Sequence, residues 1–187
     1  MSFSILSYYK NIIFDYDGTI SRIPIDWTKI RTKFISIAHT QFNYIFDESL
    51  RVDEMEHILL TKTSINPQKI FQIRSEVENI CTGKHINNDN LVNYIRETNS
   101  SFFIVSNNLQ ATVEGNIKDT GIQKSFKKII GCDTYCVMKP STLSWQKLAS
   151  EFDLKTSDTL VVGDSPQTDG VYAKNIGLPY FQIPSFR

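Results

Sequence analysis

The chain has 187 residues, which suits one ordinary domain or a core domain with a modest insertion. Its 20 basic and 20 acidic side chains cancel, which argues against nucleic acid or an anionic membrane as an obligate partner. No stretch approaches the roughly 18 apolar residues of a transmembrane helix, and the N-terminus lacks a signal-peptide pattern. Three cysteines are too few for a disulfide framework, so we expect a reduced, cytoplasmic protein.

The first predicted element is a short buried strand at residues 12–14, which ends in a polar sequence. The residues that follow it are Asp15, Tyr16, Asp17, Gly18 and Thr19. Side chains alternate faces along a strand, so the two aspartates would point the same way if the strand continued. Two carboxylates placed together are unfavourable unless a cation or a substrate uses them. An ordinary Asp-Gly turn is the alternative interpretation of this segment taken alone.

Residues 21–87 contain three predicted helices in succession, without strands. Apolar residues recur at helical spacing at Trp27, Ile30, Phe34, Ile37, Ala38 and Phe42, and again at Met55, Ile58 and Leu59. A third helix begins at Asn66-Pro67, a capping residue followed by proline in the first turn, and continues through Ile80. We therefore expect a small helical insertion at residues 21–87.

Strands and helices alternate over the rest of the chain. The predicted strands lie near residues 101–106, 128–131, 159–164 and 180–183, and the predicted helices near 89–95, 109–120, 141–151 and 171–175. Gly121 and Gly177 follow two of these helices and suit left-handed C-terminal caps. This alternation predicts an α/β fold with a Rossmann-like parallel sheet core, formed by residues 1–20 and 88–187.

Three of the predicted strands end in polar side chains, namely Asp15, Ser106 and Asp164. Ligands of such sheets bind beyond the carboxyl ends of the strands. Carboxylates gathered there repel one another, and a hard divalent cation such as Mg²⁺ removes that conflict while also binding a substrate phosphate. Lys139, which precedes a proline and a helix, would supply positive charge to that phosphate.

Four segments, in this order, resemble the four motifs of the haloacid dehalogenase (HAD) superfamily. They are Phe14-Asp15-Tyr16-Asp17-Gly18-Thr19, Val105-Ser106-Asn107, Lys139-Pro140 and Gly163-Asp164-Ser165-Pro166-Gln167-Thr168-Asp169. Together they frame nearly the whole chain. The resemblance implies a HAD-like core whose insertion at residues 21–87 is a small helical cap domain that closes over the site and selects the leaving group.

The resemblance also implies an activity, that of a Mg²⁺-dependent phosphatase working through an aspartyl-phosphate. Asp15 would be the nucleophile and Asp17 the general acid and base. Ser106 would bind the transferring phosphoryl oxygens, and Lys139 would neutralise charge on the nucleophile and the phosphate.

The same resemblance implies a magnesium site and contacts to substrate. The metal would be held by Asp15, by the backbone carbonyl of Asp17 and by Asp164. Asp169 would act at the edge of the site, through water or by orienting the lysine.

Four further residues are predicted to bind substrate. Gly18, Thr19 and Asn107 lie in the motifs beside the expected phosphate position. Arg22 follows the first motif and could reach a second anionic group.

A dehalogenase is disfavoured because members with that activity lack the second aspartate, here Asp17, whose proton suits an alkoxide leaving group. Two alternatives to a phosphatase stay open: a phosphomutase similar to β-phosphoglucomutase, and a phosphate-binding regulatory protein with little turnover. The expected partner is a small phosphorylated metabolite, with no nucleic acid or membrane partner. The expected state is a monomer or a homodimer.

Overall fold

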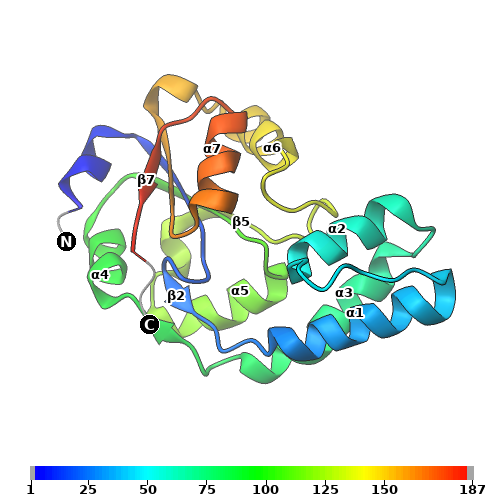
Figure 1. Ribbon diagram of the computed structural model, residues 1–187. Helices are drawn as coiled ribbons and strands as arrows, with labels where there is room; N and C mark the ends of the chain where they lie inside the picture. Colours follow the sequence, from blue (N-terminus) through cyan, green and yellow to red (C-terminus); the bar gives the residue numbers. More distant parts are fainter. Residues whose placement is uncertain (1–2, 185–187) are drawn as a thin grey trace. The chain divides into compact units, whose positions relative to one another are not determined.

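The structure is a computed structural model that describes residues 3–184 (Figure 1). The chain divides into two compact units. The core unit runs up to Ile23 and resumes at Gly83, and the helical unit is Pro24–Thr82. Among the described residues, none of the helices is both long enough and apolar enough to cross a bilayer.

The core unit is built on a five-stranded sheet with the order β5-β4-β1-β6-β7. The strands are β1 (Asn11–Phe14), β4 (Ser101–Val105), β5 (Phe126–Ile130), β6 (Thr159–Gly163) and β7 (Tyr180–Gln182). Every neighbouring pair in this sheet is parallel. The predicted α/β fold with a parallel, Rossmann-like sheet is therefore confirmed.

Helices cover both faces of this sheet (Figure 1). They are α4 (Asp89–Glu97), α5 (Gln110–Ile117), α6 (Leu143–Phe152) and α7 (Val171–Asn175), with short helical turns η1 (Ser4–Tyr8), η3 (Lys118–Thr120), η4 (Gln123–Ser125), η5 (Thr156–Asp158) and η6 (Pro166–Gly170). On one face Ile13 and Phe103 pack with Leu148 of α6 and Tyr172 of α7 in one hydrophobic cluster. Alternate strand residues point to the opposite face, because side chains along a strand repeat with a period of two residues.

The two connections to the helical unit are joined by a small antiparallel ladder. β2 (Ser21–Arg22) pairs with β3 (Ile86–Asn87), so that Ser21 lies opposite Asn87. The side-chain oxygen of Asn116 on α5 accepts hydrogen bonds from the Gly83 amide at 3.1 Å and from His85 Nδ1 at 3.0 Å. These contacts place residues 21–23 and 83–87 in the core unit, whereas the sequence interpretation assigned them to the insertion.

The helical unit contains α1 (Trp27–Phe42), α2 (Val52–Lys62) and α3 (Pro67–Glu78), followed by the short turn η2 (Asn79–Cys81). As predicted, the Asn66 side chain caps α3 by accepting from the Gln68 amide, and proline follows in the first turn. The helix ends earlier than the sequence suggested. Ile80 lies on η2 and is 56% exposed, so it does not extend the apolar face of α3.

A buried ion cluster crosses the interior of the helical unit. Arg74 Nη1 donates to Glu56 Oε2 at 2.6 Å, and Arg74 Nε donates to Glu78 Oε1 at 2.6 Å. All three side chains are essentially inaccessible. The guanidinium carbon also lies 5.2 Å from the centre of the Trp27 ring, and Trp27 is partly exposed rather than fully in the core. The cluster carries two carboxylates for one arginine, and burial raises the pKa of Glu56, although Arg74 opposes this.

Candidate active site

The ends of three adjacent strands bring polar side chains to one edge of the sheet. Asp15, Ser106 and Asp164 are the first residues after β1, β4 and β6. The sheet holds two of them by their main chains, because the Asp15 amide donates to Val162 O at 2.8 Å and the Ser106 amide donates to Ile130 O at 2.9 Å. Their positions are thus fixed by the ladder itself.

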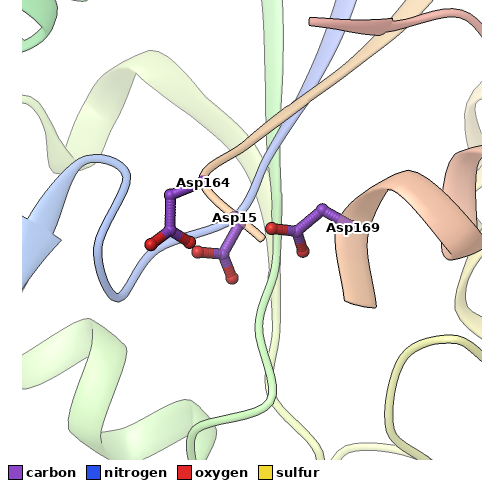
Figure 2. Close-up of side chains that lie close together, drawn as sticks. All are labelled: Asp15, Asp164 and Asp169. Carbon is purple, nitrogen blue, oxygen red and sulfur yellow. The ribbon is translucent and has the colours of Figure 1, made fainter. Parts of the chain in front are cut away.

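Three carboxylates gather at this edge (Figure 2). Asp15, Asp164 and Asp169 each offer an oxygen within 4.8 Å of the others. Asp15 and Asp169 are buried, and Asp164 is half-buried. Asp169 comes from η6, which follows β6 and turns its carboxylate back toward the strand ends.

Lys139 is the positive charge inside this group. Its Nζ donates to Asp15 Oδ1 at 2.7 Å and to Asp169 Oδ1 at 2.6 Å. Burial by itself would lower the pKa of Lys139, but the attraction of these two carboxylates outweighs it and raises the pKa. The lysine therefore stays charged at neutral pH, and its ammonium is held between the Asp15 and Asp169 carboxylates.

The pKa of the Asp15 carboxyl lies well above that of a free aspartate side chain. Its burial raises its pKa from 3.8 to about 7; Lys139 opposes the rise, and Asp169 and Asp164 add to it. Three carboxylates against one lysine leave an excess of negative charge. An all-oxygen set of this kind is the donor chemistry that hard divalent cations such as Mg²⁺ prefer, so the residues present fit a cation.

The other residues of the first motif have defined partners. Asp17 lies outside the group of three carboxylates, and its Oδ1 accepts from the Ile23 amide at 2.8 Å. Gly18 adopts φ +89°, and a Cβ there would lie 2.4 Å from Asp164 Oδ2, so only glycine fits. The buried Thr19 hydroxyl donates to Asp15 Oδ2 at 3.1 Å. This threonine thus contacts the carboxyl of Asp15.

The side chain of Asn107 binds the lysine's main chain. Its Oδ1 accepts from the Lys139 amide at 2.7 Å, and its Nδ2 donates to the Lys139 carbonyl at 3.3 Å. The sequence interpretation expected a contact to substrate and did not anticipate this pairing. Arg22, the other residue expected at substrate, lies exposed on β2 opposite Ile86.

One buried residue beside the site was missed by the sequence interpretation. Asn108 Oδ1 accepts from Ser106 Oγ at 3.1 Å, and the Asn108 amide donates to the same Oγ at 3.1 Å. Asn108 Nδ2 has no hydrogen-bond partner among the described residues. A polar residue two positions beyond a buried strand was the available signal, but such residues are common in loops.

Comparison with known families identifies this arrangement. A family model described as haloacid dehalogenase-like hydrolase matches residues 12–183, which is most of the chain. The chain belongs to the haloacid dehalogenase-like hydrolases. The resemblance drawn from the four sequence motifs is therefore confirmed.

Solved structures of other HAD-like proteins share the fold. A Bacteroides fragilis protein provisionally described as a haloacid dehalogenase-like hydrolase has TM-score 0.65 and 18% identity, covering 95% of this chain and 88% of its own. A Lactobacillus plantarum protein provisionally described as a phosphoglycolate phosphatase has TM-score 0.60 and 14% identity, covering 92% and 84%. The magnesium-bound HAD hydrolase YfnB of Bacillus subtilis has TM-score 0.57 and 17% identity, covering 94% and 87%. A search of curated protein sequences found no match.

Proposed function

We propose that this HAD-like hydrolase is a Mg²⁺-dependent phosphatase that hydrolyses a small phosphomonoester through an aspartyl-phosphate. The observation that carries the proposal is the buried Asp15 carboxyl, bound to Lys139 and within 4.8 Å of two further carboxylates. The family membership and the phosphatase description of the Lactobacillus plantarum protein support the same reading.

In this proposal Asp15, Asp164 and Asp169 hold or border the cation, together with the backbone carbonyl of Asp17. A bound Mg²⁺ would offset the negative charge of the carboxylates and of the phosphoryl group. Lys139 acts from the protein side: its ammonium neutralises charge on Asp15 and on the phosphoryl oxygens. The Ser106 hydroxyl, which donates to Asn108 Oδ1 in this structure, would turn its one proton to a phosphoryl oxygen when the phosphate is bound.

The chemistry proceeds in two displacements at phosphorus. An Asp15 oxygen attacks the phosphorus atom, the bond to the ester oxygen breaks, and Asp17 gives that oxygen a proton. Water then attacks the same phosphorus atom, Asp17 takes a proton from it, and the bond to Asp15 breaks to release inorganic phosphate. Asp17 serves both steps in this proposal because its carboxylate is separate from the three clustered carboxylates and is not itself the nucleophile.

The helical unit has its place in this proposal as the cap that selects the leaving group. We assign that role to Pro24–Thr82 from the family resemblance alone. The identity of the alcohol released is therefore to be found by assay.

The test is a panel of sugar phosphates, phosphoglycolate, nucleotides and pyrophosphate, assayed with Mg²⁺ for the wild type and for Asp15→Asn. Asp89→Asn is the matched control, because Asp89 is an exposed residue on α4. We expect wild type and control to release phosphate from at least one ester, and Asp15→Asn to release none. The proposal fails if the wild type turns over nothing or if Asp15→Asn keeps its rate. An isomerised product without free phosphate would identify a mutase instead.

A further inference from the structure

Tyr180, which opens β7, binds the last residue of the neighbouring strand. Its Oη donates to the carbonyl of Gly163 at 3.0 Å. Gly163 ends β6, and the next residue is Asp164. The Ile183 amide donates to the same carbonyl at 2.9 Å, so two donors from the β7 segment fix the peptide that leads into this aspartate.

The ring of the same tyrosine lies against Gly170, the residue that follows Asp169. A Cβ built on Gly170 would lie 3.3 Å from Cε1 and 3.4 Å from Cδ1 of Tyr180. The ring edge therefore lies close beside Gly170, where a larger side chain would crowd it. One tyrosine therefore touches the immediate neighbours of two carboxylates in the acidic cluster, Asp164 and Asp169.

The segment between these contacts is tightly packed. Asp169 Oδ2 accepts from the Ser165 amide at 3.1 Å, and a Cβ on Gly163 would lie 2.2 Å from that same oxygen. Lys139 and the Ser165 amide hold the Asp169 carboxylate from within the turn, and the two contacts of Tyr180 hold the residues next to Asp164 and Asp169 from the β7 side.

The surroundings of the Tyr180 phenol keep it protonated. Burial raises the pKa of Tyr180, and the carboxylates of Asp169, Asp164 and Asp15 raise it further. The phenol therefore keeps its proton at physiological pH and remains a hydrogen-bond donor to the Gly163 carbonyl.

We propose that Tyr180 is a positioning residue for the metal site, fixing the separation of the Asp164 and Asp169 carboxylates through its contacts with Gly163 and Gly170. This inference rests on the proposed function only in taking these carboxylates as the cation's surroundings. Groups that orient metal ligands typically change metal affinity by about 10-fold to 100-fold when removed. A brace that acts through the main chain belongs at the lower end of that range.

The test is a titration of the full chain with Mn²⁺, followed by electron paramagnetic resonance of the free ion, with Mg²⁺ calorimetry alongside. Tyr180→Phe removes only the hydroxyl, and we expect Mn²⁺ affinity to fall by about 10-fold. Tyr180→Leu also removes the ring contact with Gly170 and should weaken binding further.

The matched control is Tyr172→Phe. Tyr172 is fully buried on α7, and its hydroxyl pairs with Ser144 Oγ at 2.9 Å rather than with the main chain beside the carboxylates. This variant should lose thermal stability while keeping its Mn²⁺ affinity within about twofold, because only the buried hydroxyl pair is broken. The comparison of Tyr172→Phe with the Tyr180 variants therefore separates a general loss of stability from a specific loss of metal affinity.

Activity gives a second readout. With an accepted ester, Tyr180→Phe should need more Mg²⁺ for half-maximal rate, yet recover most of kcat when Mg²⁺ is saturating. The inference is overturned if both Tyr180 variants bind Mn²⁺ as the wild type does, or if the wild type binds neither cation. A wild type that binds Mn²⁺ but hydrolyses no ester would refute the phosphatase proposal alone, and the titration would still decide the role of Tyr180.

Discussion

Asn107 and Lys139 are joined through both atoms of one side-chain amide, although 32 positions separate them in the sequence. The asparagine follows Ser106 at the end of β4, so it ties the main chain of the lysine to the sheet edge. A lysine side chain has many rotamers. Fixing the main chain of Lys139 limits the positions that its Nζ can take and so favours the contact with Asp15.

The first prediction concerns this tie. Asn107→Ala removes both hydrogen bonds to the Lys139 main chain, so the ammonium is held less firmly. We expect kcat to fall by roughly 10-fold to 30-fold, which is about 1.4–2 kcal/mol of transition-state stabilisation. Asn175→Ala is the control. Asn175 is exposed, and its Nδ2 donates at 3.2 Å to the carbonyl of Pro140, the residue that follows Lys139. This variant should keep kcat within about twofold. Equal losses in the two variants, measured by steady-state kinetics, would refute the assignment.

A double mutant sharpens this test. If Asn107 acts through Lys139, then Asn107→Ala should add little to the loss already caused by Lys139→Ala. Additive losses would instead mean that Asn107 contacts the substrate directly, as the sequence interpretation expected.

The second prediction is a pH dependence of the metal-free protein. The folded pKa of Asp15 is about 7 against 3.8 for the free side chain, so between these values the folded state binds a proton that the unfolded state has lost. Stability from this group is present below about pH 4 and is lost as pH rises through about 7. Thermal melts in chelator should show this decline in the wild type and a shallower one in Asp15→Asn. Asp89→Asn should follow the wild type.

Magnesium should reverse that trend, since the cation favours the ionised carboxyl. The increase in Tm on adding Mg²⁺ is therefore expected to be larger at pH 8 than at pH 5.5. An increase that is equal at both pH values, or larger at the lower one, would contradict the assignment of Asp15 to the metal site.

The third prediction concerns the close approach at Gly163. A methyl group at this position would lie 2.2 Å from Asp169 Oδ2, so Gly163→Ala must displace the carboxylate that orients Lys139. Displacement of a reacting group by about 1 Å can reduce the rate by roughly 100-fold, and we expect a loss of that order. Gly121→Ala is the control: its φ of +73° makes alanine costly by about 1–2 kcal/mol, but its Cβ would meet nothing within 4 Å. That variant should melt earlier and retain kcat.

The fourth prediction concerns the buried ion cluster of the helical unit. Arg74→Met leaves Glu56 and Glu78 buried without their cation, and we expect a loss of about 3–5 kcal/mol in unfolding free energy. Glu56→Gln should be far milder, because burial already favours the uncharged form of Glu56 and its Oε1 has no partner among the described residues. Urea unfolding would measure both. A larger loss for Glu56→Gln than for Arg74→Met would show that this account of the cluster is wrong.

Much of the fold followed from the sequence because the strands are continuous apolar runs that end abruptly in polar residues. Asp15, Ser106 and Asp164 could be predicted to share one edge, since parallel strands align their carboxyl ends. The partners of Asn107 could not, because they depend on the path of residues 131–138, which has no regular periodicity. Tyr180 was read only as a strand residue; its position depends on two glycines that are distant in the sequence.

The helical unit shows the same limit of periodicity. Apolar spacing located α1, α2 and α3, but it does not indicate which charged side chains are buried. Arg74, Glu56 and Glu78 are nevertheless buried, with the guanidinium paired to both carboxylates. The Arg74–Glu78 pair has the i,i+4 spacing of a single helix, but the Arg74–Glu56 pair joins α3 to α2 and is a tertiary contact that no single helical pattern contains.

The short ladder between β2 and β3 has a consequence for how this chain can vary. Ser21 and Asn87 are hydrogen-bonded neighbours. The sixty-odd residues between them therefore begin and end at the same place on the core, like the loop that connects the two strands of a hairpin. The entropy of closing such a loop grows only slowly with its length. Segments of quite different size and sequence could therefore be exchanged at this junction while the strand ends that carry Asp15, Ser106 and Asp164 keep their register.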